Sequence, residues 1–233
     1  MYSEPKLFAA GDRAICIEFG EEISPEVNRL VKEFILELST RAVPGIEDWV
    51  PAYRSVLVYY DPGTINYPAI ETLLVDLNRE SVEHPYSPPT VIDIPTLYGG
   101  VYGPDLEHVA AVNDLTPLEV IAIHSETEYL VYMMGFTPGF PYLGGLSDKI
   151  ATPRLLQPRA VVPSGSVGIA GAQTGIYPID SPGAWQIIGR AAVKLVDLAL
   201  DSPFLLGVGD HLRFVPVSES EYASILANYQ LKV

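Results

Sequence analysis

The chain has 233 residues, of which 48% are hydrophobic and 18% are charged, and its formal net charge is −15 at pH 7. These figures are typical of a folded protein with a sizeable core, and the length allows one large domain or two small ones. So negative a charge argues against a nucleic-acid-binding protein and against a protein that binds anionic membranes.

The sequence contains no visible signal for export or membrane insertion. Its first residues, MYSEPKLFAAGD, have neither a basic n-region nor an apolar h-region, and no window of 18 residues is both uncharged and apolar. The one cysteine, Cys16, permits no internal disulfide, and its place in the run AICIEF predicts a core thiol. We therefore expect a cytoplasmic protein.

The first part of the chain predicts alternating strands and helices. Residues Ala14–Phe19 alternate as a half-buried strand does, and Ser24 suits the N-cap of an amphipathic helix that follows it. Two further strands are expected at Ile46–Val50 and Ser55–Tyr60, and a second helix after Asn66. The order β-α-β-β-α predicts an α+β sandwich of the ferredoxin-like type.

A Pro- and Ser-rich stretch, SVEHPYSPPT at Ser81–Thr90, predicts a linker. We therefore expect an α+β N-terminal domain over residues 1–86 and a second domain over residues 87–233.

The second domain is predicted to be rich in β-structure. A strand-like VIDIP is followed by two short helices, one after Gly103-Pro104-Asp105 and one at TPLE, where Thr116 and Glu119 form a capping box. After Tyr129, short β-like segments recur about every eight to twelve residues as far as Asp210–Val217. This spacing predicts a barrel or a sandwich.

Residues 135–190 contain ten of the 19 glycines and seven of the 21 prolines, interleaved with Tyr142, Tyr177 and Trp185. Disordered linkers lack such aromatic residues, so we expect ordered loops whose backbone approaches another group closely. The three aromatic side chains either line a pocket or pack against the loops.

Residues 149–179, which we call the basic segment, contain Lys149, Arg154 and Arg159 but no acid, whereas residues 81–148 contain nine acids and no Lys or Arg. The basic segment suits binding of an anion or pairing with the acidic stretch, and both interpretations stay open. Each arginine suits recognition of a carboxylate or phosphate, or an ordinary ion pair.

Further candidates lie in the same region or at its edge. Ser164, Ser166 and Ser181 offer hydroxyls to a polar ligand or hold turns, and Gly165 serves backbone geometry. His124 is expected at a helix C-terminus, which stabilises a protonated imidazole. It is either a pocket residue or a histidine that only ends the helix.

Several common site motifs are absent from the sequence. There is no Walker-type phosphate loop, and no pair of histidines has the local spacing of metal ligands, so we predict no metal site in this chain. The segment Ser164–Gly168 lacks the first glycine of a nucleophile elbow.

As a set, the motifs resemble the family of the B subunit of 5-oxoprolinase, which also includes the Kip-inhibitor (KipI) proteins and allophanate hydrolase subunit 1. The strings that carry the resemblance are GDRAICIEFG, VPAYRSVLVYYDP, YGGVYGPDL, GFTPGFPYLGGL, TPRLLQPRAVVPSGSVGIAGAQTGIYPIDSPGAW, IGR and GDHLRFVPV, and they cover nearly the whole chain.

The resemblance implies an N-terminal α+β domain followed by a cyclophilin-like β-barrel. It implies a role as the B subunit of an ATP-dependent 5-oxoprolinase that opens 5-oxo-L-proline to L-glutamate. The partners implied are a C subunit, similar to allophanate hydrolase subunit 2, and a LamB/YcsF-like A subunit. ATP, with magnesium, is implied for the complex and not for this chain alone, which is expected to be inactive by itself.

In that reaction Arg154 and Arg159 suit anion binding, the backbone N–H groups of Ser164–Ser166 suit an oxyanion or a phosphate, and His124 suits proton transfer. Two positions depart from the family pattern: Ala184 replaces a glycine and Val101 replaces an acid. Two other roles remain open, namely inhibition of a sporulation-type histidine kinase and a role as an allophanate hydrolase or urea amidolyase component.

Overall fold

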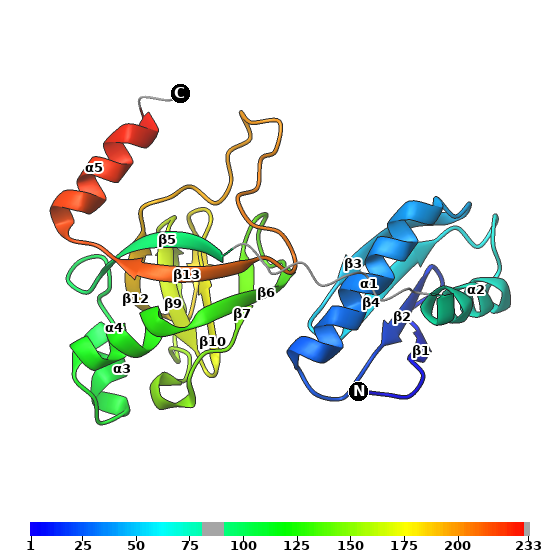
Figure 1. Ribbon diagram of the computed structural model, residues 1–233, viewed down its shortest axis with the longest axis horizontal. Coiled ribbons are helices and arrows are strands. Elements are labelled where there is room, and N and C mark those ends of the chain that lie inside the picture. The colour runs from blue at the N-terminus through cyan, green and yellow to red at the C-terminus, as the bar shows by residue number, and fades with distance from the viewer. Residues whose placement is uncertain (81–90, 231–233) are drawn as a thin grey trace. The chain divides into compact units, whose positions relative to one another are not determined.

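A computed structural model describes residues 1–80 and 91–230. The chain forms two compact units, one before residues 81–90 and one after them. The predicted linker and the predicted boundary between residues 86 and 87 lie outside the described residues. Figure 1 labels the helices and strands in both units.

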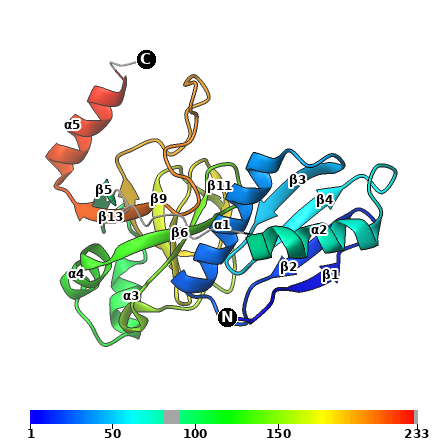
Figure 2. The same ribbon diagram turned by 45° about the vertical axis from the view of Figure 1, so that its right-hand side comes forward.

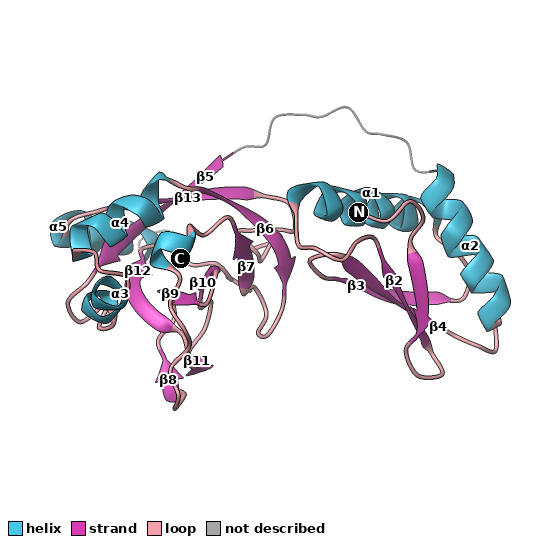
Figure 3. Ribbon diagram, turned by 90° about the horizontal axis from the view of Figure 1, so that it is seen from below, coloured by secondary structure: helices cyan, strands magenta, loops and turns pink. Residues whose placement is uncertain are grey.

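The N-terminal unit is a four-stranded antiparallel sheet with helices α1, Pro25–Arg41, and α2, Tyr67–Glu80, packed on one face (Figure 3). The strands lie in the order β1-β2-β4-β3 and are β1, Lys6–Ala9, β2, Ala14–Glu18, β3, Ile46–Pro51, and β4, Ser55–Tyr60. The predicted series β-α-β-β-α is present, from β2 to α2.

The predicted ferredoxin-like topology is not confirmed, because the strand that pairs with the outer edge of β2 precedes β2 in the chain and does not follow α2. In a ferredoxin-like sandwich the last strand takes that position. Here β1, which precedes β2 in the chain, pairs with it antiparallel. Cys16 lies on β2 but is only half-buried, so the predicted core thiol is wrong. Its neighbours Ile15 and Ile17, which face the helices, are fully buried.

Helix α1 begins where the sequence predicts it. The Ser24 hydroxyl accepts a hydrogen bond from the Val27 N–H at 3.3 Å, and Pro25 occupies the first turn. The helix ends at Ala42, whose φ of 42° lies in the left-handed region.

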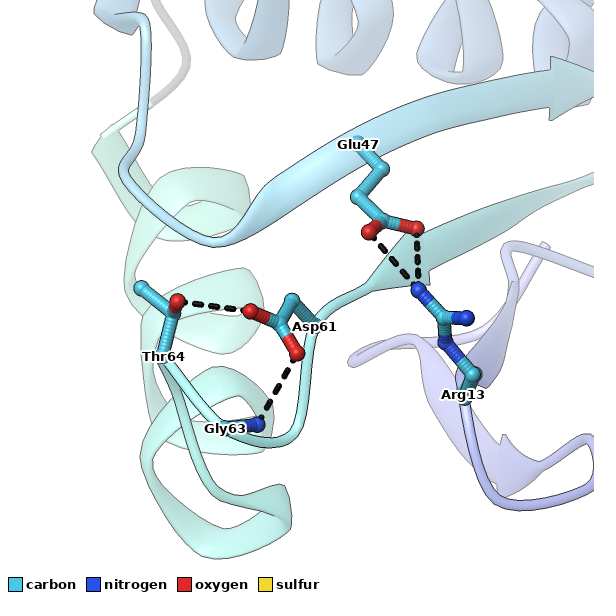
Figure 4. A network of polar contacts seen from close by, with 5 residues as sticks. All are labelled: Arg13, Glu47, Asp61, Gly63 and Thr64. Atoms are coloured by element: carbon cyan, nitrogen blue, oxygen red, sulfur yellow. Dashed lines mark hydrogen bonds and ion pairs between the residues drawn. The ribbon is translucent and has the colours of Figure 1, made fainter.

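Two polar contacts fix the loops of the same unit (Figure 4). The Arg13 guanidinium donates to both carboxylate oxygens of Glu47, at 2.7 and 2.8 Å. Asp61 accepts from the Gly63 N–H and the Thr64 hydroxyl, and the Thr64 hydrogen bond is the main cause that lowers the pKa of Asp61. This Asx turn directs the chain from β4 towards α2.

The second unit is a closed, seven-stranded mixed β-barrel, so the predicted barrel is confirmed (Figures 1 and 2). Its strands lie in the order β10-β7-β6-β13-β5-β12-β9, and only the pair β5–β13 is parallel. The strands are β5, Val91–Tyr98, β6, Glu128–Met134, β7, Pro141–Gly144, β9, Ser166–Ala170, β10, Gln173–Ile176, β12, Gln186–Ala191, and β13, His211–Pro216.

Outside the barrel wall, β8, Arg159–Val162, pairs with β11, Ser181–Gly183, as a separate ribbon. The helical elements are α3, Leu106–Val112, α4, Pro117–Glu126, the short η1, Asp148–Ile150, and α5, Glu219–Gln230. The predicted capping box of α4 is present, since the Thr116 hydroxyl accepts from the Glu119 N–H and the Glu119 carboxylate accepts from the Thr116 N–H.

Apolar side chains fill the barrel, which is therefore a packed core and not a channel. Val131, Leu143, Ile169, Ile188 and Phe214 are all fully buried in one cluster. A ligand must therefore bind on the outside of the barrel, among the loops and the β8–β11 ribbon.

Candidate functional site

A pocket of about 320 Å³ opens on the outside of the barrel. It is lined by Phe136, Phe140, Tyr142, Arg154, Pro158, Tyr177, Pro182, Gly183, Ala184 and Trp185. Four of the residues predicted from sequence meet in this pocket: Tyr142, Arg154, Tyr177 and Trp185. We call it the aromatic pocket.

Neighbouring strands position the wall of the aromatic pocket. Tyr142 lies on β7, and β7 pairs with β10, after which the chain reaches Tyr177. Trp185 lies between β11 and β12. Phe140, which was not predicted from the sequence, lies edge-on to Tyr177 and Trp185, with ring centroids 5.2 and 5.4 Å away.

Glycines allow these rings to approach the backbone closely. A Cβ atom on Gly183 would lie 2.3 Å from the Tyr177 hydroxyl oxygen, and one on Gly175 would lie 3.1 Å from both the Phe140 and the Trp185 rings. The expectation that the glycines of this region serve close backbone approach is therefore confirmed at these two positions.

Arg154 supplies the charge of the aromatic pocket. Its side chain is exposed, and no carboxylate of the described residues lies within ion-pair distance of it. Burial raises the pKa of Tyr142 and of Tyr177, and the positive charge of Arg154 partly opposes both shifts. The guanidinium therefore lies near the two hydroxyl-bearing rings and is available to an anion.

Arg159, in contrast, is already paired within the protein. Its Nη2 donates to Asp105 Oδ1 at 2.7 Å, and its Nη1 donates to the Trp185 carbonyl at 3.2 Å. The predicted role of Arg159 in substrate binding is not supported, because its guanidinium is already paired with the Asp105 carboxylate. Arg159 does not line the pocket and instead holds the Trp185 backbone through the hydrogen bond to its carbonyl.

The loop Ser164–Ser166 does not present the N–H groups that its sequence suggested for an oxyanion or phosphate. The N–H of Ser164 donates to Asp180, that of Gly165 to the Tyr177 carbonyl, and that of Ser166 to the Pro163 carbonyl. All three donors are used inside the protein, so the loop is a structural turn.

The hydroxyls of the three predicted serines do not reach the aromatic pocket either. Ser164 Oγ donates to the Pro178 carbonyl, and Ser181 is buried. Ser166 is fully buried, and its Oγ has no partner among the described residues. None of the three lines the aromatic pocket.

His124 lies in the last turn of α4, near the helix C-terminus as predicted, but its side chain is fully buried in the barrel unit. Burial lowers its pKa to about 3, so the predicted protonated imidazole is wrong. Its Nδ1 and Nε2 bond to the Tyr98 hydroxyl at 2.7 Å and the Thr174 hydroxyl at 2.9 Å. A side chain without exposed surface cannot transfer a proton to a substrate in this conformation, so His124 is a core residue.

The two departures from the family pattern have different places in the fold. Ala184 lines the aromatic pocket and has no left-handed φ, so the replacement of glycine causes no backbone strain there. Val101 is 86% exposed in the turn after β5 and does not line the pocket. The missing acid at position 101 therefore leaves the charge of the pocket unchanged.

Two features are absent from residues 1–80 and 91–230. None of the helices described there is long and apolar enough to cross a membrane. Within the same ranges, no three His, Cys, Asp or Glu side chains gather in a way that could hold a metal ion.

In this chain an α+β sheet unit precedes a mixed barrel that carries an aromatic pocket, and the family comparison places such a chain in the carboxyltransferase class. The chain belongs to the family described as carboxyltransferase domain, subdomain C and D, whose model matches residues 5–206. The resemblance that the sequence motifs indicated is therefore confirmed at the level of the family.

Similar proteins include two bacterial proteins that are each named as the B subunit of 5-oxoprolinase. The protein from Bacillus subtilis is 44% identical over 91% of this chain and 92% of its own length, and that from Escherichia coli O157:H7 is 42% identical over 89% and 98%. The solved structure of TTHA0988 is 36% identical with a TM-score of 0.80 over 88% of this chain. This chain spans only 40% of the TTHA0988 chain.

A more distant similarity links the chain to a larger enzyme. The urea amidolyase of Lachancea kluyveri is 26% identical over 91% of this chain, which corresponds to 13% of the length of that enzyme.

Proposed function

We propose that this chain acts as the B subunit of an ATP-dependent 5-oxoprolinase, which opens 5-oxo-L-proline to L-glutamate. The observation that carries the proposal is the aromatic pocket, in which Arg154 is the charged residue of an otherwise uncharged, largely aromatic wall. A small lactam ring that bears a carboxylate matches this combination. The two bacterial relatives that carry the same name support this assignment.

The chemistry explains what the pocket contributes. A five-membered lactam is a resonance-stabilised amide with a poor leaving group, so its carbonyl must be activated, for which ATP supplies a phosphoryl group. Arg154 would bind the substrate carboxylate, and the rings of Tyr142, Tyr177 and Trp185 would pack on the lactam. These contacts hold the substrate in one orientation and exclude water from one face of it.

ATP and magnesium are assigned to the complex and not to this chain. The backbone donors of Ser164–Ser166, the predicted phosphate contacts, are all engaged within the protein. The described residues also hold no group of three or more His, Cys, Asp or Glu side chains that could bind a metal ion. We infer that a partner protein supplies the nucleotide site.

The partners in this proposal are the C subunit, similar to allophanate hydrolase subunit 2, and the LamB/YcsF-like A subunit. Two findings support a partner: the matching family model covers subdomains C and D of a carboxyltransferase domain, and the TTHA0988 chain extends well beyond its matched part. The cyclophilin-like character of the barrel and the cytoplasmic location remain predictions.

Reconstitution tests the proposed function directly. The chain combined with A and C subunits should hydrolyse 5-oxoproline with ATP, whereas the chain alone should not. Full activity of the A and C subunits without it would show that the chain takes no part in the reaction.

Arg154→Ala should raise the KM for 5-oxoproline by roughly 10- to 100-fold, the effect expected when a charge-assisted hydrogen bond is lost. Stability should stay within about 0.5 kcal/mol, because the side chain is exposed. Steady-state kinetics and thermal unfolding of the variant measure both effects.

The matched control is Lys149→Ala, which removes a positive charge from the basic segment outside the pocket. It should leave the KM unchanged. Equal effects of the two variants would mean that only the net charge of the segment matters.

The similarity to urea amidolyase supports one alternative, an amidolyase-type component that handles a small carboxylated amide. Activity of the reconstituted complex towards allophanate, and not towards 5-oxoproline, would favour it. Inhibition of a histidine kinase stays a hypothesis, which an autophosphorylation assay with the purified chain would test.

A further inference from the structure

We infer that Phe136 is a substrate-contacting residue of the aromatic pocket, which determines specificity by covering the bound ring. The inference rests on the proposed function. Phe136 lines the pocket together with Arg154, and its ring lies edge-on to Phe140, with 5.7 Å between the centroids and an interplanar angle of 82°.

The backbone of Phe136 is held in an unfavourable conformation. Its φ of 64° lies in the left-handed region, which a bulky aromatic residue rarely adopts. Strain of this kind persists only when the surroundings fix it, and it gathers at ligand sites. The energetic cost of the left-handed conformation at Phe136 therefore indicates a role in binding and not in packing alone.

Hydrogen bonds fix this conformation from both sides. The Gly135 N–H donates to the Phe140 carbonyl, the Thr137 N–H donates to the Gly135 carbonyl, and the Phe140 N–H donates to the Thr137 carbonyl. At Gly139, a Cβ atom would lie 2.1 Å from a methyl group of Val196, so the loop is also packed closely against its neighbour. The loop thus presents Phe136 rigidly.

What the loop presents is a largely exposed ring. Phe136 is 62% exposed, whereas Phe140 in the same loop is 1% exposed. An exposed, strained aromatic side chain does not stabilise the fold by burial, which favours a role in binding.

Phe136 also lines a second hollow, of about 490 Å³, whose other residues include Thr137, Phe204 and Leu206 and carry no charged side chain. A carboxylate-bearing ligand therefore binds on the Arg154 side. On that side, the Phe136 ring would cover the substrate opposite the wall formed by Tyr177 and Trp185.

The test uses the complete complex with its A and C subunits. Phe136→Gly removes the ring and relieves the left-handed strain, so the KM for 5-oxoproline should rise about tenfold, in line with the loss of one ring contact, without a loss of folding stability. Phe136→Tyr keeps the ring and should keep the KM close to that of the unchanged complex.

Ala42→Gly is the matched control for the backbone, because it relieves left-handed strain in the N-terminal unit. It should not change the KM. A Phe136→Gly complex with unchanged KM would overturn the inference, as would a rise in KM that arises only because the subunits no longer assemble, measured by size-exclusion chromatography. If the unchanged complex shows no 5-oxoprolinase activity, the proposed function fails, and this inference fails with it.

Discussion

Asp105→Ala is expected to lower the free energy of unfolding of the barrel unit by about 3 kcal/mol, the cost of removing one partner from a largely buried ion pair. The Asp105 side chain is 12% exposed and that of Arg159 is 31% exposed. One carboxylate oxygen accepts from Arg159, and the other accepts from the Ile187 N–H on β12. The variant leaves both donors without this acceptor, so the loss combines an unpaired charge with an unsatisfied amide.

Asp93→Ala is the matched control on the same barrel. Asp93 pairs with Arg213 at 2.9 Å, but the two side chains are 54% and 45% exposed. Solvent screens such a pair, so its loss should cost at most about 1 kcal/mol. Urea unfolding followed by tryptophan fluorescence, with Trp185 in the barrel unit as the probe, measures both variants. Similar losses in the two would show that Asp105 and Arg159 are no more important than a surface pair.

The same pair changes the expectation for Arg159→Ala. From sequence alone this variant is expected to weaken substrate use and to leave stability nearly unchanged. Because the structure pairs Arg159 with Asp105, the variant should destabilise the protein, and any loss of activity should follow from the displaced Trp185 carbonyl.

Features fixed by neighbouring residues were predictable from the sequence. The cap at Ser24 and the capping box of Thr116 and Glu119 are local hydrogen-bond patterns, and each helix begins where its pattern indicates. The β-rich second half was predictable from short strands and turn residues. The edge strand β1 was missed because its four residues, KLFA, show no alternation of apolar and polar side chains.

Contacts between distant residues were not predictable in this way. Arg154 and Arg159 have the same residue type and lie five positions apart, yet one lines a pocket and the other pairs with an aspartate 54 positions away. The aromatic residues of the pocket were visible by composition, but the left-handed backbone of Phe136 has no signal in residue type. The sequence predicts that His124 lies near a helix end, but it does not predict that the barrel unit buries this side chain.

His124 is expected to make the protein less stable as the pH falls from about 6.5 towards 3. In the unfolded chain its pKa is near 6.5, whereas burial lowers it to about 3 in the folded protein. Between these values the unfolded state binds a proton that the folded state does not, so acid favours unfolding. The contribution should make the protein about 1.4 kcal/mol more stable at a pH one unit above the unfolded-state pKa than at a pH one unit below it.

The hydrogen bonds explain why the neutral ring suits this site. The Thr174 hydroxyl donates to the Gly168 carbonyl at 3.0 Å, so it accepts from His124 Nε2–H. The opposite nitrogen, Nδ1, then accepts from the Tyr98 hydroxyl. One neutral tautomer satisfies all these groups, whereas a second proton would introduce a charge into a core that contains Phe214, with its ring centroid only 4.4 Å away.

Urea unfolding at the two pH values should therefore show that two variants differ in how much their free energy of unfolding changes with pH. His124→Gln should lose this part of the pH dependence, although it will also be less stable at both values because the core contacts change. His108→Gln removes the same ring from an exposed position on α3 and should keep the pH dependence of the unchanged protein. If both variants retain it, another group is responsible for the acid sensitivity, and the buried neutral histidine is not the cause.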